Sequence, residues 1–117
     1  MTTLYTTEDD EGRIIVLTMI AKLNGEYRFL YAGTSWKLQV HASGKKAVLD
    51  INNVVQDVDN HPVTRPAAKL VRKKDGVWVS FVSFKRKGKV SQRKTHSRTG
   101  EGFLDCAAKT LRSIYYG

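Results

Sequence analysis

The 117-residue chain contains one cysteine, Cys106, and this scarcity excludes an internal disulfide. A single thiol also provides too few ligands for a cysteine-bound zinc site. Both facts fit a reducing compartment, so we expect the protein to be cytoplasmic.

No apolar run approaches the ~20 residues of a membrane-spanning helix, and Thr2 to Asp10 is polar and acidic rather than a basic leader. Neither export nor a membrane partner is expected.

Signals for catalysis are also few. The sequence has no phosphate-cradling glycine motif and no serine at a nucleophile elbow. Asp57, Asp59 and His61 form an acid-rich cluster that could hold a divalent metal in a nuclease, but they fall in an expected loop, where polar residues are common. Cys106 has no neighbour that would activate it. We predict no catalytic residue, metal or cofactor and interpret the protein as a non-enzyme, with a metal-dependent nuclease as the lesser alternative.

Acidic residues are missing from one long stretch of the chain. Lys85 to Arg98 carries seven Lys/Arg and His96 but no Asp or Glu. Residues 65–98 hold twelve Lys/Arg and one acid, whereas residues 1–64 hold six Lys/Arg and eight acids, so the net charge of +9 comes from this one segment. A surface that needs only solubility mixes both signs of charge. The block therefore indicates an anionic partner.

The first part of the chain is predicted to be mainly β-structure over residues 12–58. Residues 1–11 contain four consecutive acids, from Glu8 to Glu11, and are expected to form a flexible arm. An alternative is that this arm folds over the basic segment and competes with its ligand. The dipeptide Asn24-Gly25 separates two apolar runs and predicts a hairpin.

Two further segments of this first part follow. Residues 36–40 alternate apolar and polar side chains, which predicts a third strand with one wet face. Lys46 to Val58 fits a helix or a strand, and the spacing of its apolar residues slightly favours a helix. Asp57 to Pro66 contains two prolines and is expected to be a loop.

The second part, residues 67–116, is predicted to run strand, strand, strand, helix. Lys74-Asp75-Gly76 marks a turn after a short first strand. Val77 to Phe84 has large apolar side chains on both faces, which predicts a central strand covered on two sides. Val90 to Ser97 is predicted to be a polar edge strand, and part of its charge could simply protect that edge from pairing.

The C-terminal segment from about Gly102 to Tyr115 predicts an amphipathic helix. Its apolar residues Phe103, Ala107 and Leu111 recur at spacings that place them on one face. The fold class expected is therefore α+β: a single domain, residues 1–117, with an antiparallel sheet of about six strands and this helix packed on it. Arg98 would lie beside the positive end of the helix dipole, where backbone N–H groups can bind phosphate.

The strand VWVSFVSF, the turn KRKGK, the strand VSQRKTHS and the helix GFLDCAAKTLRSIY resemble two families. Three strands and a helix are similar to the integrase arm-binding and ethylene-response-factor type of DNA-binding domain, which implies major-groove reading by a sheet face. With a helix over residues 46–58, the order also resembles a double-stranded-RNA-binding domain, which implies that a basic helix start and a strand-connecting loop grip the backbone.

These features predict a small, regulatory protein that grips nucleic-acid phosphates, with DNA slightly favoured over RNA. Trp36 and Trp78 could stack on bases, but tryptophans within apolar strands are more often core residues. The alternative is an inhibitor or adaptor whose basic face docks on an acidic protein surface, because charge complementarity steers both encounters. A homodimer is compatible with either function. The predicted contact residues are Arg72, Lys73, Lys74, Lys85, Arg86, Lys87, Lys89, Arg93, Lys94, His96 and Arg98.

Overall fold

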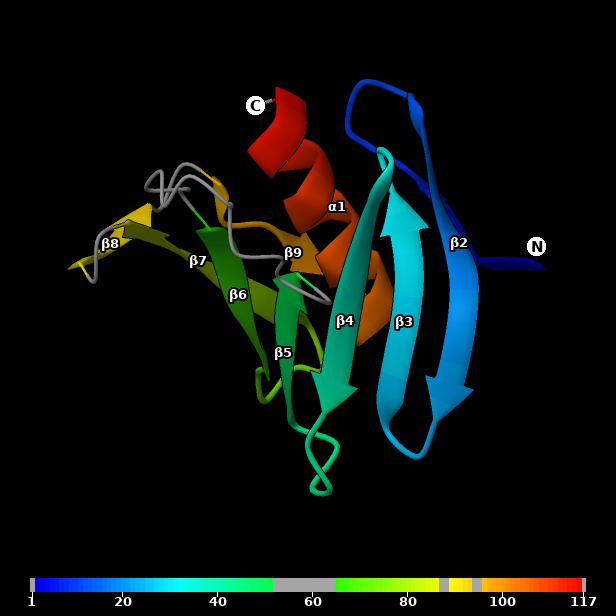
Figure 1. Cartoon of the computed structure of the whole chain (residues 1–117). Coiled ribbons are helices and arrows are strands. Elements are labelled where there is room, and N and C mark those ends of the chain that lie inside the picture. Colours follow the sequence, from blue (N-terminus) through cyan, green and yellow to red (C-terminus); the bar gives the residue numbers. More distant parts are fainter. Residues whose placement is uncertain (1, 52–64, 87–88, 94–95, 117) are drawn as a thin grey trace.

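The computed structural model describes residues 2–51, 65–86, 89–93 and 96–116. They form a curled antiparallel sheet that wraps around one C-terminal helix (Figure 1). Strands β1 to β8 are neighbours in chain order, and β9 pairs with β7 beside the helix. The elements are β1 (Thr2–Glu8), β2 (Ile14–Leu23), β3 (Glu26–Tyr31), β4 (Thr34–Val40), β5 (Lys46–Ile51), β6 (Arg65–Arg72), β7 (Trp78–Arg86), β8 (Lys89–Arg93), β9 (Thr99–Gly100) and α1 (Phe103–Tyr116).

The core lies between the inner face of the sheet and α1. Alternate residues of strands β3 to β7 point inward, so that Phe29, Trp36 and Leu38 are fully buried while their sequence neighbours are not. The helix contributes Ala107 and Leu111 to the same core. Irregular pairing between Thr3 and Tyr5 in β1, and between Met19 and Ala21 in β2, adds local bends that help the sheet curl.

The predicted α+β class is confirmed, as are several of its parts. The Asn24-Gly25 turn joins β2 to β3, with Leu23 opposite Glu26 and Gly25 at a φ of 72°. The amphipathic helix forms with the predicted apolar face inward. The expected strand count of about six was too low, because the described residues form nine strands.

Two sequence predictions for individual segments were wrong. Lys46–Ile51 is the strand β5, with Ala47 and Leu49 buried and Val48 exposed, whereas the spacing favoured a helix. Pairing with β4 on one side and β6 on the other explains this outcome, since sheet partners override weak local preference. Residues 52–58 of that prediction lie outside the described residues. The arm expected to be flexible is instead strand β1 over Thr2–Glu8, paired with β2.

The prediction that Val77 to Phe84 is covered on two sides also needs correction. Trp78, Ser80 and Val82 point inward and are buried against the helix side, but Phe81 is 44% exposed on the outer face. Only one helix lies against the described part of the sheet, so the described residues cover only the inner face of β7 (Figure 1). Strand β7 is nevertheless internal to the sheet, because it pairs with β6 on one side and with β8 and β9 on the other.

Candidate functional site

Several of the predicted basic residues lie near one or the other end of β7. Arg72 pairs with Trp78 at the beginning of this strand, whereas Arg86 pairs with Lys89 at its end. Nine strand residues span roughly 27 Å at about 3.4 Å per residue. The turn around Lys73 and the β7–β8 hairpin therefore lie at opposite ends of the same strand.

One of these ends carries cations from two turns, which we call the turn-end cluster: Lys45, Lys46, Arg72, Lys73 and Lys74. The Arg72 amide donates to the carbonyl of Lys45 over 2.9 Å, which joins the β4–β5 and β6–β7 turns. All five residues are exposed. Asp75, the acid of this turn, accepts a hydrogen bond from the Val77 amide over 3.0 Å and thereby holds the turn. Lys45 and Lys46 were missed in the sequence analysis, because their proximity to Arg72 depends on the pairing of β5 with β6.

The other end of β7 is the β7–β8 hairpin. Lys85 and Arg86 belong to β7, and Lys89 and Arg93 belong to β8. Lys85 pairs with Val90, and Arg93 pairs with Val82. The backbones of these four basic residues therefore lie in two adjacent strands. Lys87 and Lys94 lie outside the described residues.

His96 and Arg98 lie on the helix side of the sheet. The Nδ1 atom of His96 is 3.0 Å from the carbonyl oxygen of Ser113, and its ring packs 5.5 Å from that of Phe84. His96 is thus half-buried and contacts α1, and its role as a phosphate contact stays a prediction. The Arg98 backbone makes two hydrogen bonds with Ser80. Its amide donates to Ser80 Oγ over 2.8 Å, and its carbonyl oxygen accepts from the Ser80 amide over 2.9 Å.

The beginning of α1 is occupied by a carboxylate of the chain itself. Asp105 is buried in the first turn, and its Oδ2 accepts from the Glu101 amide over 3.3 Å and from Lys109 Nζ over 2.9 Å. Its Oδ1 accepts from Thr7 Oγ1 over 2.7 Å and from Tyr5 Oη over 3.0 Å. This carboxylate places a negative charge of the chain itself near the positive end of the helix dipole, and phosphate binding there stays a prediction.

These contacts set the charge state of Asp105. Burial by itself would raise the pKa of this carboxyl, but hydrogen bonds from Thr7, Lys109 and Tyr5 outweigh burial and lower it below its ordinary value. The hydrogen bond between Lys109 and Asp105 also raises the pKa of Lys109. Asp105 is therefore ionised at neutral pH and ties β1 to the helix.

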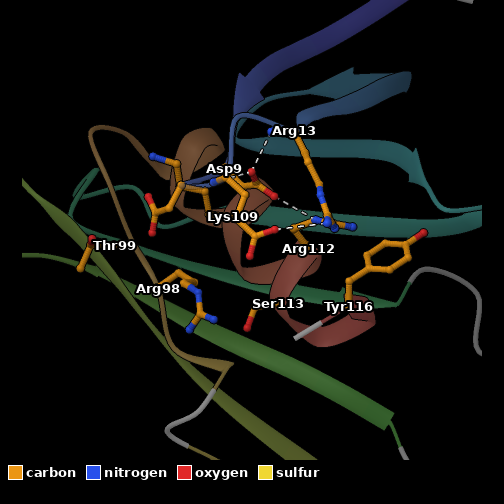
Figure 2. A pocket seen from close by; sticks show the side chains of 10 residues that line it. Asp9, Arg13, Arg98, Thr99, Lys109, Arg112, Ser113 and Tyr116 are labelled. Carbon is orange, nitrogen blue, oxygen red and sulfur yellow. Dashed lines mark hydrogen bonds and ion pairs between the residues drawn. The ribbon is translucent and has the colours of Figure 1, made fainter.

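The acidic turn after β1 faces the helix as well (Figure 2). Asp9 Oδ2 accepts from Arg112 Nε over 3.1 Å, and Glu11 pairs with Arg13 over 3.3 Å. The amide of Arg13 and, to a smaller extent, Arg112 lower the pKa of Asp9. These groups line a hollow of about 400 Å³ that also includes Arg98 and Ser113. The acidic residues thus contact cations of α1 and of their own turn.

Cys106 and the tryptophans are core residues. Burial raises the pKa of the Cys106 thiol to about 11, so that it is protonated at neutral pH. Trp36 is fully buried and Trp78 is 4% exposed, which confirms their assignment to the core and removes them as stacking surfaces. Within residues 2–51, 65–86, 89–93 and 96–116, no group of three His, Cys, Asp or Glu side chains is arranged to hold a metal ion. The sequence cluster of Asp57, Asp59 and His61 lies outside these residues.

Comparison of the chain with protein-family models, with curated proteins and with solved structures finds no match in any of the three. The resemblance to sheet-reading DNA-binding domains therefore stays a prediction. The resemblance to a double-stranded-RNA-binding domain depended on a helix over residues 46–58, and Lys46–Ile51 is a strand. In the described part of the chain, no helix has the length and apolar character that crossing a membrane requires.

Proposed function

We propose that this protein binds nucleic acid through the phosphate backbone, using the cations of strands β6 to β8 and the turns that connect them. The observation that carries the proposal is the separation of charge within the fold. The neighbouring strands β6 to β8 contain seven Lys/Arg and no acid, and the β6–β7 turn adds Lys73, Lys74 and Asp75. A one-sign surface of this kind attracts polyanions and releases their counterions on binding.

The contacts of the acidic residues support the proposal. Asp9, Glu11 and Asp105 pair with Arg112, Arg13 and Lys109 respectively, which belong to the helix or to the β1–β2 turn. Asp75 hydrogen-bonds the backbone of its own turn. These acids are therefore engaged in holding the fold, and the exposed side chains of Arg72, Lys73 and Lys74 can meet phosphates.

The test is fluorescence anisotropy with labelled duplex DNA, single-stranded DNA and RNA over a range of salt concentrations. We expect binding that weakens with salt, with a log–log slope of about −5 on duplex DNA if six phosphates are neutralised. The double variant Arg72→Ala/Lys73→Ala should reduce affinity for every ligand and make the slope shallower by about two.

The matched control is Arg13→Ala/Lys22→Ala, which removes the same charge from exposed positions at β2. It should change affinity much less than the Arg72/Lys73 variant. Equal losses from both variants would show that only net charge matters and would refute the assigned surface. An absence of salt-dependent binding to all three polymers would overturn the proposal and favour docking on an acidic protein surface.

A further inference from the structure

The outer face of strands β5, β6 and β7 is an uncovered surface of the described structure. Register places Val48, Lys69 and Phe81 side by side in one row across the three strands. The adjacent row, one pleat nearer to the turn-end cluster, contains Lys46, Val71 and Val79. We call these six residues the outer-face grid. It contains four apolar side chains and two lysines.

Phe81 is the unusual member of this grid. It is 44% exposed although it lies in the middle of an internal strand, where a large aromatic side chain would normally be covered. Its neighbours along the strand on the same face, Val79 and Ser83, are small and half-buried, so that they leave the ring accessible. Phe81 is therefore a platform onto which another planar group can stack.

The charged residues around Phe81 indicate the chemistry of its ligand. Lys69 lies directly opposite on β6 and is exposed, and paired positions of this kind have Cβ atoms about 5 Å apart. Lys46 follows in the next row, and the turn-end cluster continues beyond it. Among the described residues, the nearest acid on this face is Asp50, which lies in the next row on the other side of Val48 and is opposite Lys37. An aromatic ring beside lysines matches a molecule that carries both planar rings and phosphates.

We infer that the outer-face grid binds single-stranded nucleic acid, with an unpaired base stacked on Phe81 and the flanking phosphates on Lys69, Lys46 and the turn-end cluster. This inference rests on the proposed function and specifies its ligand. Bases in a duplex stack on each other and cannot offer a face to Phe81, whereas unpaired bases can. Apart from its two lysines, the grid has no side chain that could hydrogen-bond a base edge, so the predicted binding has little sequence preference.

The experiment compares Phe81→Ala with wild-type protein, using anisotropy with a labelled oligo-dT strand of about 15 nucleotides and with a duplex of equal length. Loss of one stacked base should weaken single-strand binding roughly 5- to 150-fold. The salt slope should not change, because no phosphate contact is removed, and duplex binding should stay within about twofold. Val16→Ala, which truncates a similarly exposed apolar residue of β2 outside the grid, should leave both affinities nearly unchanged.

Two additional variants separate stacking from apolar contact. Phe81→Leu keeps an apolar side chain but not the ring and should behave like Phe81→Ala. Phe81→Trp should retain or increase affinity, and its fluorescence should be quenched by oligo-dT because the indole would lie under a base. Trp36 and Trp78 are buried and should contribute an almost constant background.

The outcomes distinguish this inference from the function on which it depends. If wild-type protein binds oligo-dT with salt dependence but Phe81→Ala binds equally well, the stacking site is wrong and the phosphate-binding proposal stands. If Phe81→Ala changes the sedimentation coefficient and not the affinity, the face is a protein interface and the inference is also wrong. If wild-type protein binds none of the polymers, both proposals are wrong.

Discussion

The two faces of β7 differ in almost every physical respect although their residues alternate along one strand. The inner residues Trp78, Ser80 and Val82 are buried, and Ser80 Oγ accepts a hydrogen bond from Thr110 of the helix over 2.7 Å. The outer residues Val79 and Phe81 meet no second layer in the described structure. An apolar side chain therefore stabilises the fold only where a second element covers it. On the open face, the same kind of side chain is available to a ligand.

The largest expected difference between the faces comes from truncating the helix side of the core. Leu111→Ala removes a fully buried side chain that packs against the sheet, and we expect it to lower the free energy of unfolding by about 2–5 kcal/mol. Urea titration monitored by tryptophan fluorescence measures this change. A loss below about 1 kcal/mol would show that the helix packs less tightly on the sheet than described.

A matched pair on β7 makes the comparison within one strand. Val82→Ala removes a fully buried side chain and should cost about 1.5–3 kcal/mol, whereas Val79→Ala on the outer face should cost less than about 1 kcal/mol. Both variants carry the same substitution in the same strand, and urea unfolding measures both. Similar losses for the two variants would contradict the assignment of an inner and an outer face.

Asp105 allows a further comparison, because its carboxylate joins the edge strand β1 to the helix. Asp105→Asn removes the ion pair with Lys109 and should destabilise the protein by about 1–3 kcal/mol at neutral pH. The folded state lowers the pKa of Asp105, so its stabilising contribution is present above the unfolded value of about 3.9 and is lost as pH falls through the folded pKa. The difference between wild type and variant should therefore shrink below about pH 4.

Unfolding measurements on both proteins from pH 7 to pH 3 test this point. Asp105→Glu is a useful companion variant, because it keeps the charge but displaces it from Tyr5 and Thr7. A gap between wild type and Asp105→Asn that stays constant across this range would contradict the description of an ionised, hydrogen-bonded carboxylate.

The smallest expected signal is the reactivity of Cys106. This thiol is fully buried under the helix, and its pKa is about 11, so a thiol reagent at pH 8 should modify almost none of it in the native protein. Addition of urea should make the reaction complete. Rapid modification under native conditions would indicate that the inner face opens without unfolding.

Local patterns correctly predicted the elements whose partners are close in sequence. Asn24-Gly25 sets a hairpin because the two strands that it joins are adjacent, and Phe103 to Ile114 presents a stripe whose period is intrinsic to a helix. The prediction for Lys46–Ile51 failed because this segment is a strand only through its pairing with β4 and β6. The first strand was missed for a related reason: it depends on β2 and on contacts from Tyr5 and Thr7 to Asp105.

The candidate site shows the same division. The sequence identified the excess of positive charge in residues 65–98, since charge is a property of composition. It listed Arg72, Arg86 and His96 together as contact residues. Only the register of β7 shows that Arg72 and Arg86 lie near opposite ends of the strand, and only the structure shows that His96 contacts the helix. The sequence analysis also treated the two faces of β7 alike, so that Phe81 was not identified as an exposed ring.

By itself, the sequence determined that this protein is a mixed α+β molecule with its surplus positive charge in one segment, because periodicity and composition are local quantities. The tertiary structure decided which cations are neighbours, that Asp105 accepts a hydrogen bond from the Glu101 amide before the helix, and that one face of β7 is uncovered by the described residues. The reason is that strand order, register and the position of α1 arise from contacts between residues far apart in the chain, and no local pattern encodes them.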